Sequence, residues 1–200
     1  MAEFDKRFLA ALALLITASS HAAEPIPAAS VVRFNTVCAN CHEGQCSGRL
    51  TFHTGAKEAS GHMQRYLGSI TDGEAENLFG LLRHTKEQCA HYPLASPISL
   101  DRALTARELS AWRNPREGGY YLPLGQLPKG EYRLRIDLST ASNGKLKITD
   151  NRFEPLVEEN LCPQQNALEF RFKVEEGPHY LTINAPVVIE MLQLKVAAKP

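Results

Sequence analysis

The stretch Gly130-Glu-Tyr-Arg-Leu-Arg-Ile-Asp-Leu138 decides the fold of the C-terminal half, because apolar and charged residues alternate along it. A period of two places the apolar side chains on one face of a β-strand and the charged side chains on the other. The alternation returns in residues 168–174, and shorter apolar segments follow at 181–183 and 187–196. Turn signals at Asn143-Gly144 and Gly177-Pro178 separate these segments. The pattern predicts an antiparallel β-sandwich.

In the part of the chain before Pro93 and Pro97, apolar residues recur at helical spacing instead. Residues 28–37 carry apolar side chains at helical spacing. A further helix is expected to begin at Thr71 or Asp72, with acidic residues in its first turn. Its apolar face consists of Ala75, Leu78, Phe79 and Leu82.

Two other segments complete the organisation of the chain. Residues 104–112 predict a short helix opened by a capping box of Thr105 and Glu108, whereas residues 44–68 show no strong period. We therefore expect a multidomain α + β protein, with a small all-α domain over residues 23–96. A β-sandwich domain follows over residues 97–200 and includes a connecting segment at 97–129.

The N-terminus has the pattern of a secretory signal peptide over residues 1–22. Lys6 and Arg7 precede an apolar run of nine residues, Phe8 to Ile16, and Ser20 and Ala22 suit a cleavage site. Nine apolar residues are too few to cross a hydrocarbon layer of about 30 Å. The mature chain is therefore expected to begin near Ala23 and to be periplasmic or secreted.

The charge balance excludes some partners. The 200 residues include 22 Lys and Arg and 22 Asp and Glu, which gives a net charge of zero. A nucleic-acid-binding protein would carry a basic excess, and a polybasic membrane segment would do so locally. No later segment approaches the ~20 apolar residues that a spanning helix needs. We therefore expect neither a nucleic acid nor a transmembrane segment.

Cys38-Ala-Asn-Cys41-His42 is a C-x-x-C-H motif, the attachment pattern of c-type haem. Two thiols on one helical turn reach the two vinyl groups of the porphyrin, and the adjacent imidazole meets the iron. Three other interpretations are weaker. A zinc site of Cys38, Cys41, Cys46 and a His lacks a second cysteine pair. A thioredoxin-like site would follow a strand, and a plain disulfide between Cys38 and Cys41 would leave His42 without a role.

Residues 28–92 resemble a class I cytochrome c domain. In that family an aromatic residue on the first helix, here Phe34, precedes the C-x-x-C-H motif. The terminal helix of the family begins with a stretch like Thr71-Asp-Gly-Glu74. The resemblance implies one haem c attached through Cys38 and Cys41, with His42 as the proximal iron ligand.

The sixth iron ligand is expected from the position of a methionine. The resemblance favours Met63, which lies where the family places this ligand; His62 and His53 are alternatives, and so is an open iron. Cys46 and Cys89 are expected to form a disulfide, because two further cysteines in a small exported domain most simply pair. Cys162 is then left over.

The C-terminal strands are similar to galactose-binding-like and carbohydrate-binding jelly rolls, which implies that a glycan or another ligand could bind there. Trp112, Tyr120, Tyr121 and Tyr180 are the candidate aromatic contacts, although a core or interdomain position is the commoner role of such residues. The main functional prediction is electron transfer by a single-haem cytochrome to a protein redox partner. The alternative is a haem-based sensor or ligand-binding protein that uses the sandwich as a binding module. A haem enzyme is a third reading, but a carrier is favoured over a catalyst.

Overall fold

The structure is a computed structural model that describes residues 25–42 and 55–197. The predicted signal peptide, Cys46 and His53 lie outside these residues. The helical elements are α2 (Ala28–Arg33), η1 (Phe34–Cys38), α3 (Ala39–His42), α4 (Ala56–Leu67), α5 (Asp72–Gln88), α6 (Ala106–Leu109) and η2 (Ser110–Trp112). The strands are β1 (Ala103–Thr105), β2 (Tyr120–Leu127), β3 (Gly130–Leu138), β4 (Gly144–Asp150), β5 (Pro155–Leu161), β6 (Ala167–Val174), β7 (Gly177–Asn184) and β8 (Ile189–Val196).

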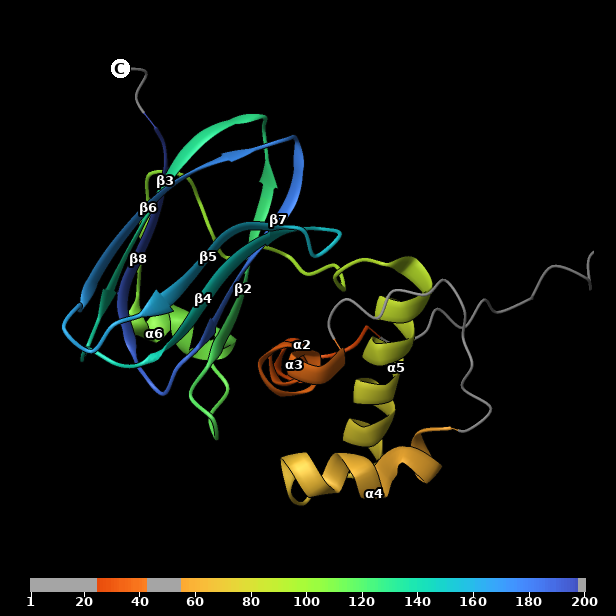
Figure 1. Ribbon diagram of the computed structural model, residues 1–200. Coiled ribbons are helices and arrows are strands. Elements are labelled where there is room, and N and C mark those ends of the chain that lie inside the picture. Colours follow the sequence, from red (N-terminus) through yellow and green to blue (C-terminus); the bar gives the residue numbers. More distant parts are fainter. Residues whose placement is uncertain (1–24, 43–54, 198–200) are drawn as a thin grey trace, which may run out of the picture.

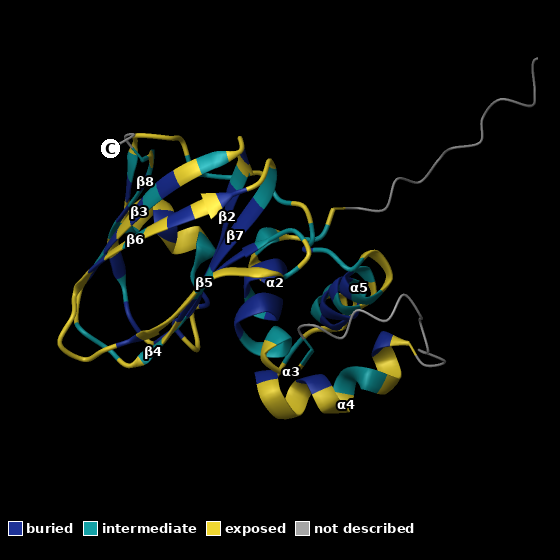
Figure 2. Cartoon of the chain, turned by 45° about the horizontal axis from the view of Figure 1, so that its top comes forward, coloured by how far each residue is buried: buried dark blue, intermediate teal, exposed yellow. Residues whose placement is uncertain are grey.

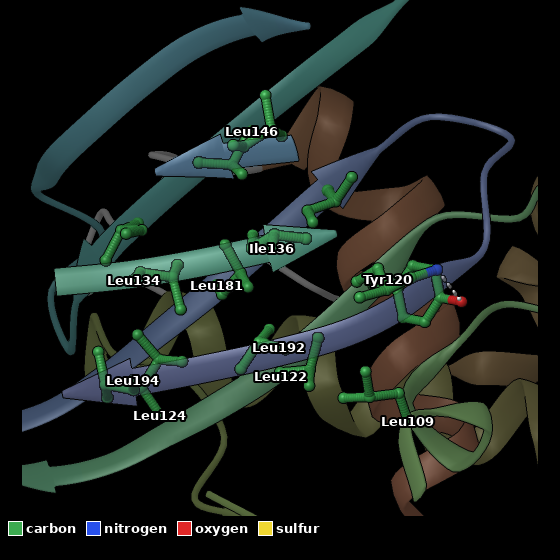
Figure 3. Close-up of a cluster of buried hydrophobic side chains, with 14 of the residues drawn as sticks. Leu109, Tyr120, Leu122, Leu124, Leu134, Ile136, Leu146, Leu181, Leu192 and Leu194 are labelled. Atoms are coloured by element: carbon green, nitrogen blue, oxygen red, sulfur yellow. Dashed lines mark hydrogen bonds between the residues drawn. The ribbon is translucent and has the colours of Figure 1, made fainter. Parts of the chain in front are cut away.

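The strands form the β-sandwich that the alternating pattern predicts (Figure 1). One four-stranded sheet has the order β1-β8-β3-β6 and the other has the order β2-β7-β4-β5, and every strand pairing within the two sheets is antiparallel. Figure 3 shows leucine and isoleucine side chains of both sheets between the two layers. Leu134 and Ile136 of β3 are completely buried there, as is Leu181 of β7. Burying each such side chain stabilises the fold by about 1.5–3 kcal/mol.

The helices follow local signals in the sequence. At the start of α5 the Thr71 side chain accepts a hydrogen bond from the Glu74 amide at 3.2 Å, as the N-cap prediction requires. At the start of α4 the Gly55 amide donates to the Glu58 carboxylate at 2.9 Å. That helix ends at Gly68, whose positive φ of 70° suits glycine. No helix within the described residues is long and apolar enough to cross a membrane.

The helical part and the sandwich share a hydrophobic cluster. The helix α2 lies between the sandwich and α5 (Figure 1), and its central residues are buried (Figure 2). Tyr121 of β2 and Tyr180 of β7 belong to the same buried cluster as Val31 and Leu78 of the helices. The sandwich therefore forms one wall of the helical core.

Asn114 fixes the helices to the hairpin that leads into β2. Its side-chain amide donates to the Thr36 hydroxyl at 2.8 Å, and its backbone amide donates to the Gly119 carbonyl at 2.7 Å. Gly119 lies so close to the helix that an added Cβ would be 3.3 Å from the Thr36 methyl group and 2.9 Å from the Ile183 carbonyl oxygen. A residue without a side chain is therefore required at this junction.

Candidate ligand-binding pocket

An apolar pocket of about 310 Å³ lies between the helices, and we call it the helical pocket. Its volume is at the lower end of the ~300–1,000 Å³ typical of small-molecule sites. Three segments line it. They supply Phe34, Val37, Cys38, Cys41 and His42 from η1 and α3, Ala59, His62, Met63, Tyr66 and Leu67 from α4, and Leu78, Phe79 and Leu82 from α5.

The residues of the C-x-x-C-H motif meet at this pocket. Cys38 ends η1, and Cys41 and His42 lie in the following turn of α3. Residues three apart on a helix lie on the same side, so both sulfur atoms reach one cavity. Cys38 is a free thiol, and no disulfide joins it to Cys41. The pocket thus receives two thiols and an imidazole from a single short segment.

The opposite wall belongs to α4, where His62, Met63 and Tyr66 line the pocket. The rings of His42 and His62 face each other edge to face, with centroids 6.1 Å apart. His62 also contacts Tyr66, whose side chain is 59% exposed, with ring centroids 5.1 Å apart. Met63 is instead buried in the cluster with Val31. The structure therefore brings two of the three candidate sixth ligands, Met63 and His62, to the same cavity.

Two arginines hold the walls of the pocket together. Arg33 of α2 donates to the Leu67 carbonyl at 2.6 Å and pairs with the Glu74 carboxylate of α5. Arg116, from the hairpin before β2, donates to the same carbonyl. Burial raises the pKa of the Cys38 thiol to about 11, although nearby Arg33 lowers it. In this environment Cys38 is a neutral thiol at physiological pH.

The remaining predicted residues lie elsewhere. Cys89, just after α5, is disulfide-bonded, and its expected partner Cys46 is outside the described residues. His53 is outside them as well. Cys162 is a free, exposed cysteine after β5, far along the chain from the motif.

Sequence reasoning named His62 and Met63 of α4 but missed Ala59, Tyr66 and Leu67, because residues 44–68 showed no clear period. Ala56, Ala59, Met63 and Leu67 are nevertheless spaced at three to four residues, and three of them are buried. That spacing is the helical signal which could have located Ala59, Tyr66 and Leu67 at the pocket.

The candidate aromatic contacts of the sandwich do not form an exposed platform. Tyr120, Tyr121 and Tyr180 are 0–3% exposed and Trp112 is half-buried. The hydroxyl of Tyr120 accepts a hydrogen bond from the Ile189 amide at 3.1 Å, inside the sandwich (Figure 3). Tyr121 and Tyr180 pack against the helices. These side chains therefore have structural positions, as is common for large aromatic residues.

Comparisons with known proteins give no family for the chain. No protein-family model matches it, and no curated protein does. Similar solved structures include a family 35 carbohydrate-binding module from an environmental isolate, with 11% identity over 42% of this chain and 73% of that one, and a TM-score of 0.30. Another is a family 6 carbohydrate-binding module of Cellvibrio mixtus lichenase 5A in complex with cellotriose, with 12% identity, 50% and 100% coverage, and a TM-score of 0.34. A C-terminal family 6 module from a Zobellia galactanivorans laminarinase has 15% identity, 39% and 72% coverage, and a TM-score of 0.31. At such TM-scores the likenesses carry no argument about function.

The prediction that this chain is an electron-transferring cytochrome c with a metal-binding group of side chains is corrected. Within residues 25–42 and 55–197, no group of three or more His, Cys, Asp or Glu side chains is placed to hold a metal ion. The motif supplies one imidazole, and His62 stands on a separate helix. No finding supports electron transfer or a protein redox partner, and neither is proposed again. The attachment of a haem group at Cys38 and Cys41 is a narrower prediction, which nothing in the described residues tests.

Proposed function

We propose that this protein is a ligand-binding protein and that the helical pocket is its binding site. The observation that carries the proposal is the convergence of Cys38, Cys41 and His42 on one apolar cavity. Small-molecule sites are typically concave and apolar, with a few polar groups that fix the ligand. Here the thiols and the imidazole of the motif lie on one wall of the pocket, and the imidazole of His62 lies on the opposite wall.

The ligand that fits these residues best is a haem c. Two sulfur atoms three residues apart would hold a flat group by two thioether bonds, and the imidazole of His42 would stand beside its centre. Phe34, Leu78 and Phe79 would cover the faces of the group and exclude water. When bound, such a group would supply an iron atom, which His42 and one further ligand could coordinate.

The position of that further ligand decides which ligands the protein accepts. Met63 remains the proposed occupant, and His62, across the pocket from His42, is the alternative. A thioether and an imidazole both bind iron in proteins. If neither side chain occupies the position, the site is open to a small external ligand, as a sensor requires.

Covalent attachment of haem requires an exported protein, so the proposed ligand and the predicted signal peptide agree on the location. We propose export by the N-terminal signal, with a mature chain that begins near Ala23. N-terminal sequencing of the protein recovered from the periplasm or the medium tests this proposal. A chain that retains Met1 would contradict it.

Extraction with acidified acetone tests whether the pocket holds the group covalently. The full-length protein is expressed with haem-maturation machinery, beside Cys38→Ala, Cys41→Ala and the matched control Cys162→Ala. We expect the coloured group to remain with the wild-type protein and with Cys162→Ala after extraction. The double variant Cys38→Ala/Cys41→Ala should release it or fail to acquire it. Extraction of the group from the wild-type protein would refute the proposal.

A further inference from the structure

A second and larger cavity, of about 750 Å³, lies where the end of α5 meets the sandwich, and we call it the junction pocket. It shares no residue with the helical pocket. The described residues that form its polar wall are His84 and Gln88 of α5, Gln126 of β2, Asn151 after β4, and His179 of β7. Segment 93–96, which connects the two parts of the chain, passes along its side. The cavity thus exists because the helical part is docked on the sandwich.

The junction pocket has no charged side chain. Among the described residues that line it, none is Lys, Arg, Asp or Glu. Burial lowers the pKa of His91 to about 3 and also lowers the pKa of His179, so both imidazoles are neutral at physiological pH. A charged ligand would lose hydration here without gaining a counter-charge. The chemistry of the wall therefore favours a neutral ligand.

His179 presents a hydrogen-bond acceptor that the fold does not use. The residue is 2% exposed, and its Nδ1 lies 2.9 Å from the Gly177 carbonyl oxygen. A carbonyl can only accept, so Nδ1 carries the proton and Nε2 keeps its lone pair. No hydrogen bond to Nε2 is formed within the described residues. Because this nitrogen is not among the buried atoms without a partner, it is accessible and can accept a hydrogen bond from a ligand.

His84 has the same arrangement on the wall that α5 provides. Its Nε2 lies 3.2 Å from the His91 carbonyl oxygen and must therefore donate to it. Its Nδ1 then remains an acceptor. The side-chain amides of Gln88 and Gln126 make no hydrogen bond to other described residues, and each offers both donors and an acceptor. Side-chain hydrogen-bonding groups that the fold leaves unused thus surround the cavity, and none of them belongs to Lys, Arg, Asp or Glu.

The floor of the junction pocket is held rigidly. His91 bonds the Thr149 hydroxyl through Nε2 at 3.0 Å and the Tyr121 hydroxyl through Nδ1 at 3.0 Å. Its ring centroid is 4.2 Å from that of Tyr180 and 4.1 Å from that of Phe153. Such packing keeps the His91 ring in place before a ligand arrives, which reduces the ordering cost of this part of the site.

We propose that the junction pocket binds a neutral, polyhydroxylated small molecule, namely a sugar or a short oligosaccharide. A hydroxyl group donates to an imidazole nitrogen and accepts from a side-chain amide, which is the mixture that His84, His179 and Gln126 offer. The rings of Pro93 and Pro178, which are exposed or half-buried, supply apolar surface for the carbon faces of a sugar. The volume suits a ligand of this size.

Titration of the full-length protein with neutral sugars tests the proposal. The probes are D-glucose, D-galactose and cellobiose, with D-glucuronate as the charged counterpart, and binding is followed by amide chemical shifts in NMR spectra. We expect at least one neutral probe to give saturable shifts at Gln88, Gln126, Asn151 and His179. D-Glucuronate should bind more weakly than D-glucose.

Substitutions locate the site. Gln126 is exposed, so Gln126→Ala should fold normally and weaken binding by about five-fold, the effect of one lost hydrogen bond. The matched control Gln164→Ala, an exposed residue outside the cavity, should leave the affinity unchanged. Cys38→Ala should also leave it unchanged, which separates this site from the helical pocket. Absence of saturable shifts with all three neutral sugars, stronger binding of D-glucuronate, or equal effects of Gln126→Ala and Gln164→Ala would overturn the proposal.

Discussion

At the scale of single residues, His91 shows how burial sets ionisation. Loss of hydration is the main cause of its low pKa, and the positive charge of Lys147 and the nearby His84 lower it further. Both ring nitrogens form hydrogen bonds with hydroxyl groups, so the neutral ring has a hydrogen-bond partner at each nitrogen in the folded protein. Protonation would place an unpaired charge in the interface between helices and sandwich.

This burial predicts a loss of stability in acid. The pKa of His91 is about 3 in the folded chain and ordinarily 6.5, so the unfolded chain binds the proton first. The contribution of His91 is therefore complete above pH 6.5 and falls as the pH decreases towards 3. We expect the free energy of unfolding to fall by about 1.4 kcal/mol per pH unit through this residue between about pH 6 and 4. Urea unfolding of the wild-type protein and His91→Gln over this range measures the difference. If the free energy of unfolding depends on pH equally in the two proteins, His91 does not cause the loss of stability in acid.

A second residue-scale prediction distinguishes Met63 from His62. Met63→Leu removes the thioether but nearly conserves the volume, so it should cost less than about 1.5 kcal/mol of stability. If Met63 is the second iron ligand of the proposed haem, this variant should become high-spin in the ferric state and bind added imidazole. His62→Ala should then remain low-spin. If His62→Ala becomes high-spin and Met63→Leu remains low-spin, His62 is the ligand. If the spin state changes in neither variant, neither side chain binds the iron.

Among the residues of the candidate site, the sequence allowed Cys38, Cys41, His42, His62 and Met63 to be predicted, and the structure brings these side chains to one pocket. The grouping of Cys38, Cys41 and His42 was predictable because the motif is local in sequence, whereas His62 and Met63 were named from the family resemblance. His84, His179 and Gln126 could not be predicted together, because they meet only where α5 docks on the sandwich. No local pattern in the sequence records that contact.

At the scale of elements, the attachment of the first helices to the sandwich depends on Asn114. This residue is 1% exposed and bonds both Thr36 of η1 and the turn before β2. Asn114→Ala would leave buried partners unsatisfied, so we expect a loss of about 1–3 kcal/mol in thermal or chemical unfolding. Asn166→Ala, at an exposed position, should change stability by less than about 0.5 kcal/mol. Similar losses in both variants would contradict the role of Asn114.

The elements differ in how clearly the sequence predicts them. Strands β3, β6, β7 and β8 alternate or are strongly apolar, and they were predicted. Strand β2 contains Pro123 and Gly125, where its register shifts, and β5 is almost entirely exposed at the edge of its sheet. These two strands lack a clean alternation because a bulge and an edge position relax the requirement for it. The start of α5 was predictable, since its capping residue lies in the sequence next to the helix that it caps.

At the scale of the whole molecule, the helices and the sandwich are joined by a common core. Tyr121 and Tyr180 of the sandwich are buried together with Val31, Leu67 and Leu78 of the helices. Because unfolding of either part would expose this cluster, we expect a single cooperative transition in scanning calorimetry. Two well-separated transitions would show that the parts unfold independently. The division into domains at residue 96 stays a prediction that such an experiment would test.

The whole-molecule claim is that the helical pocket holds a covalently bound ligand, and the mass of the exported, intact protein tests it most directly. We predict a polypeptide that begins near Ala23 and carries the additional mass of one haem group, which survives denaturation. The variant Cys38→Ala/Cys41→Ala should have the mass of the polypeptide alone, and Cys162→Ala should retain the addition. An unmodified mass for the wild-type protein, purified from cells that mature haem proteins, would contradict the claim.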